Sequence, residues 1–263
     1  MPVASLNGVN IFYKVDGDPS NPPLIFSNSL GTDHTMWDAQ LPQLVQSFYL
    51  IRYDTRGHGQ STAPKGPYQI DDLGKDVIAL LDYLNISKVN FCGLSMGGVI
   101  GQWLGINHPE RINCLVLANT APRVGTQDSW NQRASLVRRE GMEQIAQSAP
   151  GRWFTQNYVD TNHSEVERLV SILRNSSAEG YASCCDALAD ADLIDRIRVI
   201  KVPTLIIAGK YDPVTTVADA IFMAKMIQNS QLYQIEASHI SNVEAYDDFS
   251  KELLKFLIWW RTL

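Results

Sequence analysis

The sequence predicts an α/β fold in which a mostly parallel sheet is flanked by helices and interrupted late by a helical insertion. Short continuous apolar runs alternate with amphipathic segments, as strands and helices do in parallel sheets. This alternation stops near residue 122 and resumes after residue 190. The chain has 263 residues, 45% of them hydrophobic and 19% charged, which suffices for one such domain with a packed core.

The first half of the chain predicts strands and helices in turn. Alternating side chains around Asn7-Gly8 predict an antiparallel edge hairpin. Apolar residues at helical spacing predict a helix over 71–84, with Asp71 or Asp72 as its N-cap. Continuous apolar runs predict strands at 24–26, 50–53, 89–94 and 112–117, and a second helix is expected at 96–106.

Residues 122–190 are mostly amphipathic and contain no strand-like run. We therefore expect a helical cap over 122–190, inserted into a core formed by 1–121 and 191–263. The core resumes with a strand at 204–208, a helix at 216–228, a strand at 231–235 and a final helix from 243. Because open α/β sheets bind ligands beyond the carboxyl ends of their strands, such a cap can cover the site.

Composition excludes several classes of function. A formal net charge of −6 argues against a nucleic-acid partner and against a polybasic membrane contact. The N-terminus lacks the pattern of a secretory signal, and no apolar run approaches the length of a membrane span. The four cysteines form no metal-binding or redox motif. We expect a cytoplasmic protein with reduced cysteines and no metal, whereas the sequence leaves the oligomeric state open.

Residues 93–97 read Gly-Leu-Ser-Met-Gly and fit the pattern G-x-S-x-G. The pattern lies between a predicted buried strand and a predicted helix, and this context resembles the nucleophile elbow of the α/β-hydrolase fold. A serine at this strained turn has free helix N–H groups beside its hydroxyl. The sequence therefore predicts Ser95 as the nucleophile.

A serine hydroxyl is a weak nucleophile and needs a base. Among the five histidines, His239 follows the last predicted strand, at the sheet edge where Ser95 is expected. We assign His239 as the base and expect structural, capping or solvent-exposed positions for His34, His58, His108 and His163.

The base in turn needs a carboxylate that holds its tautomer and stabilises its charged form. Asp212 follows the strand at 204–208, and the order Ser95, Asp212, His239 is the one expected for this fold. The alternative for Asp212 is a helix N-cap or an Asx-turn. Asp54 also follows a strand but precedes Ser95, so we expect it to hold its own loop.

Acyl transfer requires donors for the developing oxyanion. One should be the backbone N–H of Met96, the residue after the nucleophile. For the other we predict the backbone N–H of Leu30, in the loop after the first buried strand.

Motifs spread over nearly the whole chain closely resemble the 3-oxoadipate enol-lactonases of bacterial aromatic catabolism. They are Ser-Leu-Gly at 29–31, Met-Trp at 36–37, Tyr-Asp-Thr-Arg-Gly-His-Gly at 53–59, Phe-Cys-Gly-Leu-Ser-Met-Gly-Gly at 91–98, Ile-Gly-Gln-Trp-Leu-Gly at 100–105, Glu-Gly-Tyr-Ala at 179–182, Ala-Gly at 208–209, Asp-Pro at 212–213 and His-Ile-Ser-Asn-Val-Glu at 239–244. The segments at 29–31, 91–98 and 100–105 are more specific than the triad motifs, which much of the superfamily shares.

The resemblance implies hydrolysis of the enol-lactone of 3-oxoadipate in the β-ketoadipate pathway, through an acyl-enzyme and without a cofactor. The substrate would be an anion, and an unpaired buried carboxylate is costly. Arg133, flanked by Trp130, is our candidate for its partner; the alternative is a surface arginine on an amphipathic helix. Trp153 is a candidate for lining the pocket, or else packs in the core.

Rival functions share the same triad. They are a broad carboxylesterase, a relative that cleaves a carbon–carbon bond or forms peracids, and a non-catalytic protein that binds a small ligand. A substrate panel separates the enzymes from one another. Stoichiometric labelling of Ser95 together with turnover separates an enzyme from a binding protein.

Overall fold

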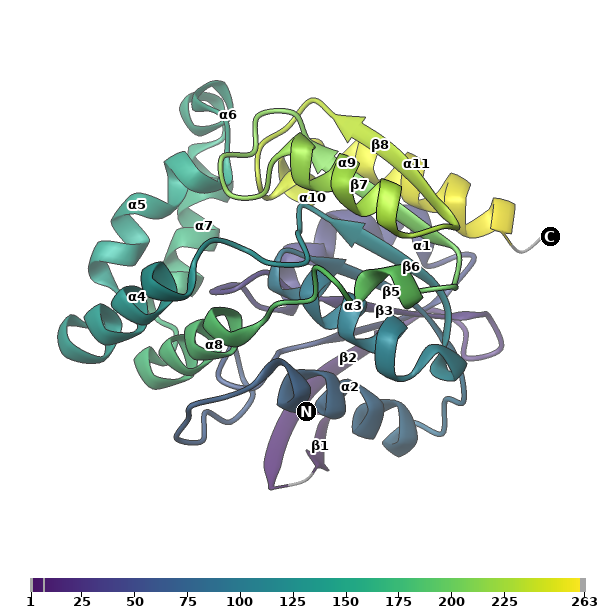
Figure 1. The fold of residues 1–263 in the computed structure, drawn as a ribbon, viewed down its shortest axis with the longest axis horizontal. Coiled ribbons are helices and arrows are strands. Elements are labelled where there is room, and N and C mark those ends of the chain that lie inside the picture. Colours follow the sequence, from purple (N-terminus) through teal and green to yellow (C-terminus); the bar gives the residue numbers. More distant parts are fainter. Residues whose placement is uncertain (1, 7, 261–263) are drawn as a thin grey trace.

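The computed structural model describes residues 2–6 and 8–260 (Figure 1). Eight strands form one sheet in the order β1-β2-β4-β3-β5-β6-β7-β8. The six strands β3 to β8 are mutually parallel, and β1 and β2 run antiparallel at one edge. The predicted α/β fold with a mostly parallel sheet is therefore confirmed. The strands are β1 (Val3–Leu6), β2 (Val9–Asp16), β3 (Pro23–Ser27), β4 (Tyr49–Tyr53), β5 (Val89–Leu94), β6 (Ile112–Ala118), β7 (Thr204–Gly209) and β8 (Ser230–Ile235).

The burial of each strand follows its place in the sheet. Every residue of β5 and β7, each paired with a strand on both sides, is buried, as their continuous apolar runs predict. The edge hairpin pairs Leu6 with Val9, and burial alternates along β1. Asn7, in the predicted turn, lies outside the described residues.

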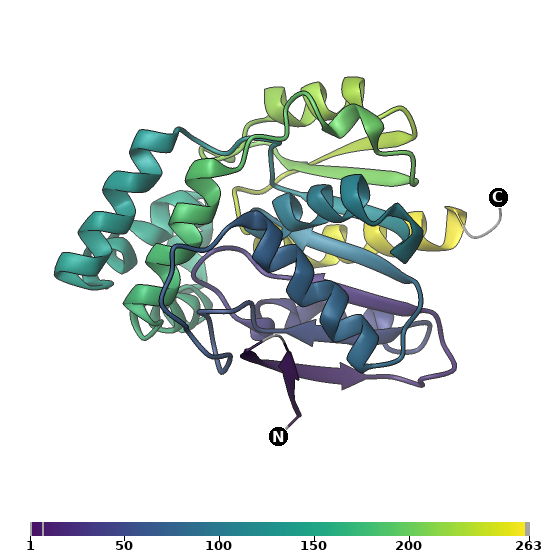
Figure 2. The ribbon, with the colours of Figure 1, turned by 60° about the horizontal axis from the view of Figure 1, so that its bottom comes forward.

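Helices cover both faces of the sheet (Figures 1 and 2). Helices α2, α3 and α9 lie on one face, whereas α1 and α11 lie on the other. The α-helices of this core are α1 (Leu41–Leu44), α2 (Ile70–Tyr83), α3 (Met96–Asn107), α9 (Val217–Met226), α10 (Ser241–Glu244) and α11 (Tyr246–Trp259). Short 3-10 helices span His34–Gln40, Pro109–Arg111 and Ile197–Val199.

The predicted N-cap of α2 was wrong. Gln69 has the extended cap conformation, and its backbone N–H donates to the Asp72 carboxylate at 2.9 Å. Asp71 and Asp72 lie inside the first turn, where their negative charges favour the positive end of the helix dipole.

Five α-helices, α4 to α8, lie between β6 and β7 and project from one end of the sheet (Figures 1 and 2). They are α4 (Gln127–Glu140), α5 (Glu143–Trp153), α6 (Gln156–Thr161), α7 (His163–Arg174) and α8 (Ala178–Asp190). Helix α4 packs on α8, and α5 packs on α7. We propose that residues 122–190 act as a cap over the core formed by 1–121 and 191–263.

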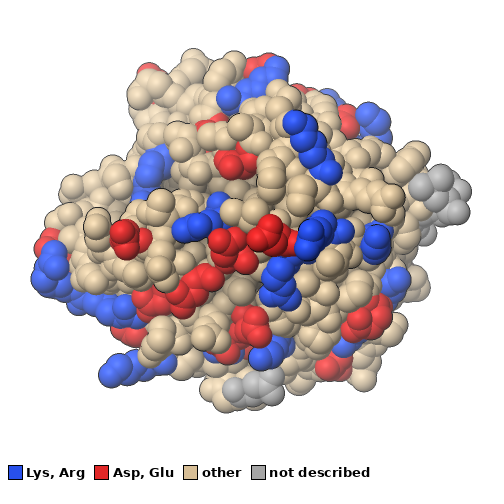
Figure 3. Space-filling model, in the orientation of Figure 1, with Lys and Arg blue, Asp and Glu red and all other residues tan. Residues whose placement is uncertain are grey.

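The molecular surface carries charges of both signs. Acidic and basic side chains are interspersed over the face in Figure 3. Among the helices of the described residues, none combines the length and apolarity that crossing a bilayer would require.

Candidate active site

Ser95 occupies a sharp turn between β5 and α3. Its backbone has φ 56° and ψ −115°, in the left-handed half of conformational space that non-glycine residues rarely adopt. Glycines on both sides permit the turn. A Cβ at Gly93 would lie 2.1 Å from the carbonyl oxygen of Gly97, and a Cβ at Gly97 would lie 2.1 Å from that of Ser27. The local sequence thus allows a serine to be held at the carboxyl end of β5.

Asp212 and His239 follow β7 and β8 and lie together at the same edge of the sheet. His239 Nδ1 is 2.8 Å from Asp212 Oδ2, and both side chains are buried. The carboxylate also accepts hydrogen bonds from the backbone N–H groups of Val214 (2.7 Å) and Thr215 (3.1 Å) and from the Thr215 hydroxyl (2.8 Å). Asp212 thus makes an Asx-type turn contact as well as facing His239.

The pKa of Asp212 is lower than its ordinary value. Burial would raise this pKa, but the facing His239 and the hydrogen bonds from His239, Asn119 and the Val214 amide outweigh burial. Asp212 is therefore an ionised acceptor that can orient His239 Nδ1–H and stabilise a protonated imidazole.

Asn119 completes the surroundings of Asp212, and the sequence analysis missed it. Its Nδ2 donates to Asp212 Oδ2 at 2.9 Å and to the Ser238 carbonyl at 3.1 Å, while its Oδ1 accepts from the Ser241 hydroxyl at 2.5 Å. Asn119 directly follows β6 and has φ 43°. Its position after a parallel strand was a usable signal, since the same rule located Asp212 and His239.

The two predicted oxyanion donors have free backbone N–H groups. Neither Leu30 nor Met96 donates its amide hydrogen to an acceptor among residues 2–6 and 8–260. The neighbouring Gly31 N–H donates to His58 Nε2 at 2.9 Å, so this nitrogen is unprotonated. Burial lowers the pKa of His58, which favours that neutral form.

His34 and Asp54 form a separate buried pair. His34 Nδ1 lies 2.8 Å from Asp54 Oδ1. Asp54 also accepts the backbone N–H of Gln60 at 2.8 Å. Asp54 therefore holds its own loop, as expected from its place in the sequence.

Ser95 and His239 line one small pocket between the sheet edge and the insertion. Its volume is about 30 Å³, and it adjoins an outer pocket of about 240 Å³ that shares several of its walls. The predicted residues Leu30, Trp130, Arg133 and Trp153 also line the inner pocket. Residues that the sequence analysis did not assign to the site complete its lining: Ser29, Arg152, Tyr181 and Val214.

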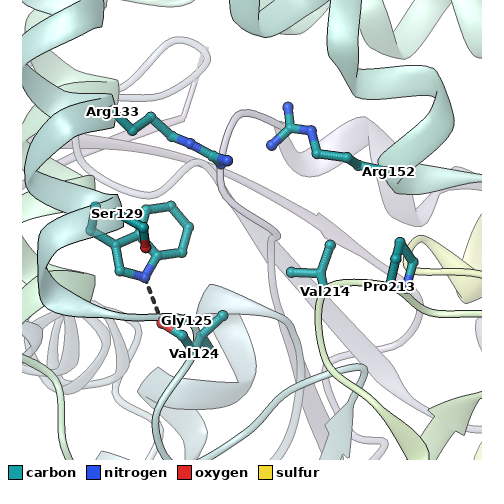
Figure 4. A pocket seen from close by; sticks show the side chains of 8 residues that line it. Val124, Gly125, Ser129, Arg133, Arg152, Pro213 and Val214 are labelled. Atoms are coloured by element: carbon teal, nitrogen blue, oxygen red, sulfur yellow. Dashed lines mark hydrogen bonds between the residues drawn. The ribbon is translucent and has the colours of Figure 1, made fainter.

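Two arginines of the insertion reach into this space from different helices (Figure 4). Arg133, from α4, places its guanidinium 4.9 Å from the ring centre of Trp130. Arg152, from α5, extends toward it from the opposite side and donates to the carbonyls of Ser148 and Ile145, both at 3.3 Å. Neither guanidinium forms an ion pair with a carboxylate of the described residues.

The electrostatics of this pair favour an anion. Burial lowers the pKa of Arg152, and the positive charge of Arg133 lowers it further, yet a guanidinium stays protonated in proteins. Burial raises the pKa of the nearby Tyr181 to about 12, although both arginines act against this rise. A bound carboxylate would relieve the repulsion between the two cations.

Within the described residues, no group of three or more His, Cys, Asp or Glu side chains is arranged to hold a metal ion. Ser95 and His239 lie in one pocket and Asp212 faces His239, an arrangement that can carry out nucleophilic acyl transfer.

The chain belongs to the alpha/beta hydrolase fold family, whose model matches residues 22–245. It is 51% identical over 242 residues to 3-oxoadipate enol-lactonase 2 of Acinetobacter baylyi, covering 92% of this chain and 91% of that protein. It is 41% identical over 247 residues to 3-oxoadipate enol-lactonase 1 of the same organism, covering 94% of this chain and 92% of that protein. The crystal structure of the enol-lactonase from Burkholderia xenovorans LB400 superimposes with a TM-score of 0.96 at 42% identity, covering 98% of this chain and all of that one.

Proposed function

We propose that this protein hydrolyses the enol-lactone of 3-oxoadipate to 3-oxoadipate, using Ser95, His239 and Asp212. The observation that carries the proposal is the pocket in which Ser95 and His239 lie beside two guanidinium groups that pair with no carboxylate of residues 2–6 and 8–260. An ester-cleaving site with a built-in anion site suits a lactone that bears a carboxylate. The identity to enol-lactonases over more than nine-tenths of the chain supports the same substrate.

The first half of the reaction opens the lactone ring. His239 takes the hydroxyl proton of Ser95 while Oγ attacks the lactone carbonyl carbon. The backbone N–H groups of Leu30 and Met96 bind the negative charge that develops on the carbonyl oxygen. The ring C–O bond then breaks, and the protonated His239 gives its proton to the leaving enolate oxygen. This leaves a neutral His239 and an acyl-enzyme whose enol ketonises.

The second half releases the acid. His239 accepts a proton from water, which attacks the acyl carbonyl, and the same oxyanion donors bind the second tetrahedral intermediate. Collapse of this intermediate returns the proton to Ser95 Oγ and frees 3-oxoadipate. Asp212 stays ionised throughout, in keeping with its lowered pKa.

Arg133 and Arg152 bind the acetate carboxylate of the substrate in this proposal. A planar guanidinium matches a carboxylate in shape and charge. Trp130 supports the Arg133 guanidinium by stacking, and Trp153 forms part of the apolar wall near Ser95.

Removing either guanidinium tests this assignment. We expect Arg133→Ala and Arg152→Ala each to raise KM for the lactone about 10-fold to 100-fold, because a hydrogen bond to a charged group contributes about 1.5–3 kcal/mol. Arg139→Ala is the matched control, since Arg139 lies on α4 and pairs with Glu140 at the surface. A neutral aryl ester should show little change in KM. An unchanged KM for the lactone, with folding intact, would remove that arginine from the site.

We also propose that the protein acts in the cytoplasm. All four cysteines, Cys92, Cys114, Cys184 and Cys185, are free and buried, which suits a reducing compartment.

A further inference from the structure

The loop that carries His239 is held on both sides by backbone hydrogen bonds. The Ser238 N–H donates to Glu244 Oε2 at 2.8 Å, and the Ile240 N–H donates to the Trp153 carbonyl at 2.9 Å. Ser238 belongs to the loop after β8 and Glu244 to α10, whereas Trp153 ends α5 of the insertion. His239 is therefore fixed partly by the core and partly by the insertion.

Glu244 joins these two parts directly. Its carboxylate accepts the Thr155 backbone N–H, 3.2 Å from Oε1, and also the Thr155 hydroxyl. Thr155 is the N-cap of α6 and accepts the Tyr158 N–H with the same hydroxyl oxygen. One half-buried carboxylate thus holds both the residue before His239 and the segment that follows Arg152 and Trp153.

We propose that Glu244 is a positioning residue that keeps the His239 loop and residues 152–155 in one fixed arrangement. The Glu244 carboxylate thereby fixes the distance between His239 and Arg152. The substrate requires such a fixed distance, because its carbonyl reacts near His239 while its own carboxylate binds Arg152. The part of this inference that concerns Arg152 rests on the function proposed above, whereas the part that concerns His239 does not.

An ionised carboxylate suits this position because it accepts hydrogen bonds at both oxygens. A glutamine has nearly the same shape but offers one acceptor oxygen, and its amide hydrogens would face either the Ser238 or the Thr155 N–H. One of the two segments would then lose its partner. A displacement of about 1 Å in a reacting group can cost about 100-fold in rate.

Glu244→Gln is the direct test, measured on the lactone and on a neutral aryl ester with active sites titrated by a fluorophosphonate. We expect kcat to fall about 10-fold to 100-fold on both substrates, because His239 serves both. KM should rise for the lactone alone, since only the lactone uses Arg152. Glu252→Gln is the matched control, because Glu252 pairs with Lys255 on α11, away from the pocket. A general loss of folding would lower the titrated fraction of active enzyme and leave KM unchanged for both substrates.

A double-mutant cycle with Thr155→Val shows whether Glu244 acts through the insertion. Valine keeps the shape of threonine and its backbone N–H, but it lacks the hydroxyl that donates to Glu244 and caps α6. We expect Thr155→Val to lower kcat/KM for the lactone and the double variant to match Glu244→Gln within about 2-fold, because coupled residues are non-additive. Three results would overturn the proposal. The first is that the effects of the two substitutions on kcat/KM simply multiply in the double variant, and the second is an unchanged kcat in Glu244→Gln. The third is an equal fall in kcat on both substrates with no rise in KM for the lactone.

Wild-type turnover separates this inference from the proposed function. A wild-type protein that cleaves the aryl ester but not the lactone would contradict the assigned substrate. The kcat of Glu244→Gln on the ester would still test the contact with the His239 loop. Should Glu244→Gln fail to fold, Thr155→Val alone carries the test of the link to the insertion.

Discussion

Asp212 accepts hydrogen bonds from five donor groups, on Asn119, Val214, Thr215 and His239. Its lowered pKa means that the folded protein favours the ionised form more than the unfolded chain does. Such a carboxylate stabilises the fold at every pH above its unfolded value, which is about 3.9. This contribution is lost as pH falls through the lower folded value.

Asp212→Asn makes this linkage measurable. We expect the wild type to have the higher free energy of unfolding, and the difference from the variant to be larger at about pH 6 than at about pH 2.5. The reason is that only the wild type has a carboxylate at position 212 that becomes protonated on acidification. Urea titrations at several pH values give the difference directly. A difference that does not vary with pH would show that Asp212 has the same pKa in the folded and unfolded states.

Asn119 can be tested without disturbing its backbone. Glycine adopts the left-handed conformation of Asn119 at no steric cost, so Asn119→Gly removes the amide and keeps the turn. We expect kcat to fall about 10-fold with a small change in KM, because Asp212 and the Ser238 carbonyl each lose a donor of about 1–3 kcal/mol. Asn85→Gly, at an exposed turn with φ 56°, is the matched control. Equal kcat values for the two variants would show that the Asn119 side chain does not contribute to catalysis through Asp212.

At the scale of elements, helix α8 of the insertion packs closely on the loop after β4. A Cβ at Gly180 would lie 2.4 Å from the Cα of Gly57 and 2.3 Å from its carbonyl oxygen. The backbones of Gly57 and Gly180 are therefore in direct contact, and no side-chain rotation could make room for a larger residue.

Gly180→Ala should destabilise the protein by about 1–3 kcal/mol, the usual cost of overpacking. Gly151→Ala is the control, because Gly151 lies in α5 with open space around it. That change should be neutral or stabilising by up to about 1 kcal/mol, since alanine favours helix more than glycine does. Urea midpoints compare the two. A Gly180→Ala protein as stable as Gly151→Ala would mean that α8 can move away from the loop.

Elements with strong periodicity were predictable, and those set by local side-chain choices were less so. Strand β5 has the bounds predicted for it, because an apolar run between polar segments marks a buried strand. The start of α2 was misplaced because glutamine is an uncommon N-cap. The 3-10 helix at His34–Gln40 follows from a cap by Asp33 and from tertiary packing, which no periodic pattern announced.

At the scale of the whole molecule, residues of the core were easier to place than residues of the insertion. Parallel strands bring their carboxyl ends to one edge, so their order along the chain predicts that Asp212 and His239 meet. Arg152 could not be found this way, because its place depends on how α4, α5 and α8 pack over that edge. Arg133 was proposed from its neighbour Trp130, and the stacking of these two side chains is present.

The central claim is that Ser95 attacks an anionic enol-lactone bound between core and insertion. The most direct measurement is the loss of enol-lactone absorbance with wild-type protein and with Ser95→Ala. We predict rapid turnover by the wild type and a loss of about 10⁶-fold in kcat in the variant, the scale seen when a nucleophilic serine is removed. Triad-dependent cleavage of simple aryl esters without lactone turnover would contradict the substrate, and lactone turnover by Ser95→Ala at the wild-type rate would contradict the mechanism.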